Sequence, residues 1–250
     1  LHFFRRSFDQ VIKLFSVLQV AIMSKDRDIC RASTTCLRFL VEESSENHTF
    51  LREALESAKK VLSPKQKNGL IFNGLMILRE VGRFLPEDVF SVTCNHFPEI
   101  MNAGCSKDVL LRKIAVKVII IHVSHVPSNI QLGYATSLLV ESNSKLSKID
   151  DLTHGLILIC KSVYKLFINH SGVFKDEKIS QLVDKLVSFT KYNNFELSSE
   201  IYDFIILISK NKKYLFNETL ISNLFMYIMS HIIKCEGLPM LIAMLYKFLE

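Results

Sequence analysis

Apolar residues recur along this chain with the spacing of amphipathic helices, at i, i+3, i+4 and i+7. The first such run falls at positions 8, 11, 12, 15, 18 and 22. After a polar break at 24–28 the pattern resumes, and we expect the next helix to bury the face made of Ile29, Ala32, Cys36, Phe39 and Leu40. Helical runs and polar breaks alternate in this way to the end of the chain. The pattern predicts an all-α protein.

Prolines and aspartates mark the expected helix ends. Pro86 is placed to open one helix, and Pro98 must kink or shorten it, because proline lacks a backbone N–H. Two similar stretches, SKDRDICRA at 24–32 and SKDVLLRKIA at 106–115, each carry an aspartate before a helical run. We expect Asp26 and Asp108 to cap the helices that follow them. The chain has 8 glycines and 5 prolines, too few for the turns of many short strands.

The breaks that join helices into pairs recur at a regular interval. They start near 24, 63, 106, 147, 191 and 234, about 39 to 44 residues apart. Two helices repeated every 40 to 47 residues or so are typical of HEAT and armadillo arrays, whereas tetratricopeptide and ankyrin repeats, at about 34 and 33 residues, are too short. A single pair cannot bury both of its apolar faces, so neighbouring pairs must stack.

The two SKD stretches also carry a family resemblance. An aspartate followed by an arginine in the first turns of the helix, as in Asp26 with Arg31 and Asp108 with Arg112, is similar to the turn inside a HEAT repeat. The chain therefore resembles an irregular ARM/HEAT-like α-solenoid, although the breaks near 63, 147, 191 and 234 lack the motif. The resemblance implies about six stacked antiparallel helix pairs in a single superhelical domain over 1–250. It also implies that the second helix of each pair lines the concave surface.

Length and composition narrow the cellular setting. The chain has 250 residues, 49% of them apolar, and a mean hydropathy of +0.23, but no apolar run reaches the roughly 18 residues of a membrane helix. We expect a buried core and no membrane partner. Because residue 1 is leucine, we expect a piece of a longer protein. Its six cysteines are scattered without a CxxC pair, which favours reduced thiols and a cytoplasmic or nuclear location.

The sequence favours a protein without enzymatic activity, cofactor or metal. It contains none of the GxSxG, P-loop, GxGxxG or HExxH motifs. The carboxylate pairs Asp150-Asp151 and Asp176-Glu177 fall at expected helix starts, where they interact favourably with the helix dipole. Two pairs of residues have the spacing of metal ligands, Cys94 with His96 and His122 with His125. Nothing in the sequence places the two pairs close together, so a metal site is disfavoured.

Basic side chains gather on the expected second helices. The net charge is +6, and three pairs share a helix face, namely Arg31 with Arg38 at i, i+7, and Lys113 with Lys117 and Lys161 with Lys165 at i, i+4. With Arg79 and Arg112, the candidate residues are Arg31, Arg38, Arg79, Arg112, Lys113, Lys117, Lys161 and Lys165. Stacked pairs would align them into a basic concave stripe, suited to an acidic peptide or helix, or to a phosphate backbone. The solvated edges of buried helices carry the same residue types, and the sequence leaves both interpretations open.

The last expected helix, GLPMLIAMLYKFLE at 237–250, is apolar nearly all round. A terminal repeat needs a polar outer face, so we expect an apolar interface here with the rest of the parent chain or with a partner: Met240, Met244, Tyr246 and Phe248. Together these features predict a non-enzymatic scaffold or adaptor that mediates protein–protein interactions in a larger complex. The alternative is a nucleic-acid-binding solenoid that uses the basic stripe.

Overall fold

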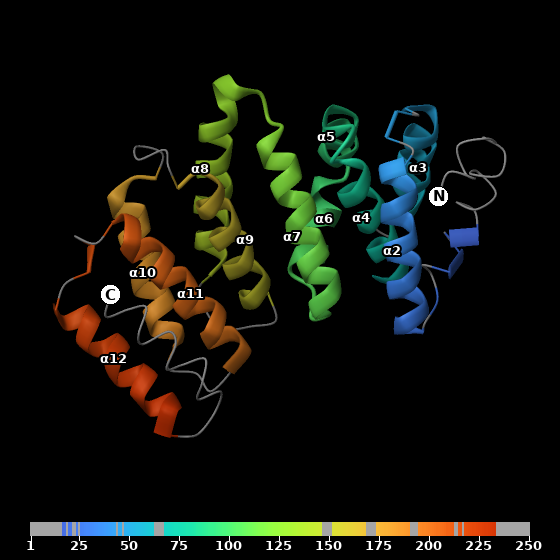
Figure 1. Cartoon of the computed structure of the whole chain (residues 1–250). Helices are drawn as coiled ribbons and strands as arrows, with labels where there is room; N and C mark the ends of the chain where they lie inside the picture. Colours follow the sequence, from blue (N-terminus) through green and yellow to red (C-terminus); the bar gives the residue numbers. More distant parts are fainter. Residues whose placement is uncertain are drawn as a thin grey trace. The chain divides into compact units, whose positions relative to one another are not determined.

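The computed structural model of the chain is all-α, with eleven α-helices and no strand among the residues that it describes. These residues are 17–18, 20–21, 24, 26–43, 45–46, 48–62, 68–146, 152–168, 174–190, 195–212, 215–216 and 218–233. Figure 1 labels the described helices. By its internal contacts the chain divides into two compact units, Leu1–Gln131 and Leu132–Glu250. The all-α prediction is confirmed, while the stacking into a solenoid and the single domain over 1–250 stay predictions.

The first unit is built from two rows of neighbouring helices. Its described helices are α2 (Arg27–Glu43), α3 (His48–Val61), α4 (Asn68–Val81), α5 (Pro86–Asn95), α6 (Phe97–Gly104) and α7 (Val109–Ser124). Helix α4 packs against both α2 and α7, so the second helices of the expected pairs are neighbours. The first helices α3 and α5 also contact each other, and α3 packs on α4 as α6 packs on α7.

The second unit shows part of the same order of packing. It holds most of α8 (Ser128–Lys145), followed by α9 (Thr153–Leu166), α10 (Asp176–Phe189), α11 (Phe195–Asn211) and α12 (Glu218–Ile233). Helices α9 and α11 are neighbours, as are α10 and α12, and α10 packs on α11. Aromatic rings fill part of this core, where Tyr164 of α9 stacks on Phe174 and meets Phe204 of α11 edge-on, with centroid distances of 5.4 and 5.8 Å.

The expected proline positions are confirmed. Pro86 is the first residue of α5, and Pro98 lies in the first turn of α6. Helix α5 ends at Asn95, and only His96 separates it from α6. Proline is tolerated in a first turn because the N–H that it lacks would have no partner inside the helix. Pro98 therefore splits the first helix of this pair into two short helices.

The buried face predicted for α2 is wrong at four of its five positions, because the side chains of Ile29, Ala32, Cys36 and Phe39 are exposed. Leu40 is buried as expected, but the other core residues of α2 are Leu37 and Val41, which are 0% and 1% exposed. Apolar residues occupy two adjacent sides of this helix, so periodicity alone did not choose between them. The side of α2 that packs on α4 is the buried one.

Side-chain hydrogen bonds join segments that lie about 40 residues apart in sequence. In the first unit Arg83, just after α4, donates from Nη1 to Oε1 of Glu42 in α2 at 2.9 Å, across 41 residues of sequence. In the second unit Lys185 of α10 donates from Nζ to the carbonyl oxygen of Asn143 in α8 at 2.7 Å, across 42 residues. The interval between the sequence breaks thus recurs in contacts between neighbouring helices.

Candidate functional site

The two SKD stretches fold alike. The serine hydroxyl oxygen accepts a hydrogen bond from the aspartate N–H at 3.1 Å in both, from Asp26 to Ser24 and from Asp108 to Ser106. The aspartate Oδ1 then accepts from the N–H groups two and three residues on, at 2.9 and 3.3 Å for Asp26 and at 2.8 and 3.1 Å for Asp108. Both aspartates cap their helices as predicted, because they satisfy N–H groups that have no partner within the helix.

Arg112, expected on the concave basic stripe, is instead buried. Only 4% of it is exposed, and its Nη1 donates to the carbonyl oxygen of Ser106 at 2.9 Å. Arg112 follows the exposed Leu110 by two positions, about 200° round the helix, which places it on the packed side of α7. Its guanidinium ties the first turn of α7 to the preceding loop and does not reach the described surface.

Arg38 and Arg79 are both engaged in ion pairs within the first unit. Arg38 Nε and Arg83 Nη1 bind the same Glu42 Oε1 at 3.0 and 2.9 Å, and the hydrogen bond from Arg38 lowers the pKa of the Glu42 carboxyl group. Glu80, whose side chain is only 4% exposed, pairs with Arg79 and with Arg83. Two carboxylates therefore balance most of the charge of three guanidinium groups.

Lys161 is paired with two carboxylates from the next second helix. Its Nζ lies 2.8 Å from Oε2 of Glu200 and 3.1 Å from Oδ2 of Asp203, both on α11. The Lys161 side chain is 20% exposed. Glu200 and Asp203 were not predicted as part of this surface. A search for opposite charges about 40 residues apart would have found them, since they follow Lys161 by 39 and 42 residues.

Three predicted basic residues present exposed side chains. Lys113 and Lys117 lie on α7, and Lys165 lies on α9 in the second unit. None of the three forms an ion pair with a side chain in the described ranges. Arg31 lies in α2, but its side chain falls outside the described part of the structure. Among the predicted basic residues of the first unit whose side chains are described, only Lys113 and Lys117 are exposed and form no ion pair.

The predicted terminal interface lies outside the described residues, which end at position 233: Met240, Met244, Tyr246 and Phe248.

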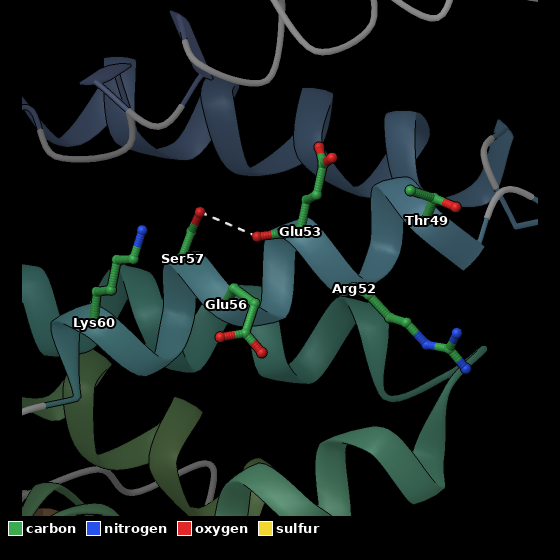
Figure 2. Close-up of a pocket in the computed structure, with 6 residues that line it drawn as sticks. All are labelled: Thr49, Arg52, Glu53, Glu56, Ser57 and Lys60. Atoms are coloured by element: carbon green, nitrogen blue, oxygen red, sulfur yellow. Dashed lines mark hydrogen bonds between the residues drawn. The ribbon is translucent and has the colours of Figure 1, made fainter.

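A shallow hollow of about 500 Å³ lies along α3, lined by Thr49, Arg52, Glu53, Glu56, Ser57 and Lys60 (Figure 2). Its charges are balanced, and two are engaged elsewhere, Arg52 with Asp88 of α5 and Glu56 with Lys59. The Ser57 hydroxyl donates to the carbonyl oxygen of Glu53 at 3.1 Å, so no base activates it. These lining side chains do not form a pair of nucleophile and base.

The histidines weighed as metal ligands face different surroundings. His122 of α7 is 3% exposed and lies between the rings of Phe90 and Phe97, with centroid distances of 4.9 and 4.5 Å. Its Nδ1 is 2.8 Å from Oγ1 of Thr93, whose proton goes to the Phe90 carbonyl oxygen. Nδ1 is therefore the donor. Burial lowers the pKa of His122 to about 4, which favours a neutral ring.

His125 lies at the end of α7, where its Nδ1 is 2.8 Å from the carbonyl oxygen of Ile121. Within the described residues, no group of three or more His, Cys, Asp or Glu side chains is arranged to hold a metal ion.

No protein-family model, curated protein or solved structure matches the chain. None of the described helices combines the length and the hydropathy needed to cross a bilayer. Among the described residues, the exposed side of α7 is the best-defined candidate functional surface.

Proposed function

We propose that the chain is a non-enzymatic helical-repeat scaffold of the ARM/HEAT kind, which binds other proteins as part of a larger complex in the cytosol or nucleus. The observation that carries the proposal is the order of helix packing. In each unit a second helix packs on the next second helix and a first helix packs on the next first helix, as α2 packs on α4 and α9 on α11. This order is typical of stacked helix pairs.

The hydrogen bonds between equivalent helices support the same proposal. They bridge 41 residues between Glu42 and Arg83 and 42 residues between Asn143 and Lys185. In a solenoid each repeat contacts only its neighbours, so contacts one period apart are the ones that stabilise the array. Stacked pairs create an extended surface, and such surfaces serve as platforms for partner proteins.

Nucleic-acid binding is the second candidate, and the exposed side chains of Lys113 and Lys117 favour it. Against it, Arg112 is buried and Lys161 is paired with Glu200 and Asp203, so fewer positive charges remain for phosphates. Affinity for a phosphate backbone scales with the number of phosphates neutralised, and few available lysines give weak binding.

Affinity capture followed by reconstitution tests the proposal. The tagged chain is captured under native conditions with nuclease present, and the retained proteins are purified and recombined with it. We expect at least one of them to form a complex of fixed stoichiometry by native mass spectrometry. A chain that stays monomeric with every retained protein, or that retains only nucleic acid when nuclease is omitted, would contradict the scaffold function.

A further inference from the structure

We propose that the exposed side of α7 made of Leu110, Lys113 and Lys117, here called the α7 stripe, docks an acidic protein segment that also carries an apolar side chain. The inference rests on the proposed protein-binding function and names the chemistry of one partner.

The three side chains of the α7 stripe lie on one side of the helix. At about 100° per residue, Leu110, Lys113 and Lys117 fall within roughly 60° of one another, and the stripe is about 10 Å long. Leu110 is 53% exposed, and both lysines are exposed. An apolar group therefore stands one turn before two ammonium groups on the same surface.

The charge of the α7 stripe is not balanced by α7 itself. The helix VLLRKIAVKVIIIHVS contains no aspartate or glutamate. The carboxylate that precedes it, Asp108, accepts hydrogen bonds from the backbone of Leu110 and Leu111. No carboxylate among the described side chains pairs with Lys113 or Lys117.

Other basic side chains of the second helices contrast with the α7 stripe. Arg38, Arg79 and Lys161 each pair with carboxylates of their own unit, which satisfies these charges within the fold. Among the predicted basic residues of the first unit whose side chains the structure describes, Lys113 and Lys117 are the two that stay exposed without an ion pair and can attract an outside anion.

The stripe fits carboxylates with an apolar neighbour better than a phosphate backbone. A lysine ammonium binds carboxylates without demanding a fixed orientation, and Leu110 offers apolar area that a sugar–phosphate chain does not use. Two lysines neutralise about two phosphates, which gives a salt dependence and an affinity far below those of proteins that make six or more phosphate contacts. An acidic amphipathic peptide uses all three side chains.

Fluorescence anisotropy with defined probes tests the inference. The main probe is a short fluorescein-labelled peptide of glutamate and leucine, and the comparison probes are a glutamate-only peptide, a lysine–leucine peptide and a DNA duplex of equal charge. We expect the full chain to bind the main probe, with affinity that falls as salt rises. The glutamate-only peptide should bind several-fold more weakly, because it cannot use Leu110.

Charge reversal locates the site. The double variant K113E/K117E should lose at least about ten-fold in affinity for the main probe, a loss of about 1.4 kcal/mol. The matched control K60E/K175E makes the same change in net charge at two exposed lysines outside α7 and should bind within about two-fold of the unchanged chain. Circular dichroism melting checks that both variants are folded.

Three results would overturn the inference: equal binding of the main probe by K113E/K117E, equal loss in K60E/K175E, or tighter binding of DNA than of the peptide. These results are distinct from a failure of the scaffold function. If a reconstituted protein partner binds K113E/K117E as tightly as it binds the unchanged chain, the docking role of the α7 stripe is contradicted. The scaffold function is still supported by that result. Peptide binding without any reconstituted partner supports the stripe and counts against the scaffold.

Discussion

Lys161 of α9 and Glu200 of α11 form an ion pair across 39 residues of sequence, with Nζ and Oε2 2.8 Å apart. Asp203 binds the same ammonium group at 3.1 Å. A side chain that the sequence marks as part of a basic binding surface is thus used to join two neighbouring helices. Contacts between helices that lie far apart in sequence, rather than composition, decide which charged side chains stay unpaired at the surface.

Substitution of Lys161 by methionine should destabilise the second unit by about 1 to 2 kcal/mol, because Glu200 and Asp203 would then face each other without a counter-charge. The change E200Q should cost less, since Asp203 still binds Lys161. Urea unfolding of the single and double variants measures the coupling between the two positions. Strictly additive effects would contradict the pairing.

Gly74 marks a close approach of α3 and α4. A Cβ at this position would lie 2.8 Å from Cγ2 of Val61 and 3.3 Å from the carbonyl oxygen of Ala58. We expect G74A to destabilise the chain by about 1 to 3 kcal/mol, because the helices must move apart. The matched control is G133A in α8, where a Cβ meets nothing within 4 Å and the higher helix propensity of alanine should stabilise by about 0.5 to 1 kcal/mol. Equal shifts of the two unfolding midpoints would refute this account.

His122 makes stability depend on pH. Its pKa of about 4 in the folded chain lies below its ordinary value of 6.5, so the unfolded chain takes up a proton that the folded chain does not. The free energy of unfolding should therefore be highest above about pH 6.5, where His122 is neutral in both states. It should fall by up to about 3 kcal/mol as the pH drops towards 4. The variant H122L should flatten this part of the pH profile, measured by urea unfolding at each pH.

Exposed His48, at the start of α3, provides the control for that measurement. The variant H48A should keep the acid-side slope of the unchanged chain. If H122L kept the slope as well, the loss of stability in acid would have to come from other groups.

Arg112 and Lys113 are adjacent in sequence and should differ sharply in their effect on stability. Loss of the buried Arg112 guanidinium and of its bond to Ser106 in R112A should cost about 2 to 4 kcal/mol. The variant K113A should stay within about 0.5 kcal/mol of the unchanged chain, since its side chain is exposed. Thermal melting of both variants makes the comparison, and a similar loss in both would show that Arg112 does not hold the turn.

The capping aspartates should have similar energetic roles in different helices. Replacement of Asp26 or Asp108 by alanine should cost about 1 kcal/mol each, because two N–H groups lose their acceptor in either helix. Asparagine at the same positions should restore most of the loss, since its side-chain oxygen accepts the same bonds. If asparagine failed to rescue either variant, the carboxylate would be acting through its charge rather than as a cap.

Much of the secondary structure could be predicted because its causes are local. A cap needs an aspartate within three residues of the N–H groups that it binds, and Pro98 breaks a helix through its own ring. The helix starts at Pro86 and after Asp108 follow from such short-range chemistry. The interval between the polar breaks could also be predicted from the sequence, since it depends only on where helices begin and end.

The buried face of α2 and the charges available on the surface could not be predicted in the same way. Ile29 and Leu37 are both apolar and lie on adjacent sides of one helix, and only the packing of α4 separates the exposed side chain from the buried one. Likewise, nothing near Lys161 in the sequence reveals that two carboxylates about 40 residues later will neutralise it.

The sequence by itself thus determined an all-α chain, its caps and its breaks, because backbone hydrogen bonds in helices close within a few residues. The tertiary structure alone decided which apolar side chains form the core and which lysines stay exposed. Burial and ion pairing depend on neighbouring helices about 40 residues away in sequence. The periodicity of one helix does not reveal which side chains of another helix will pack against it.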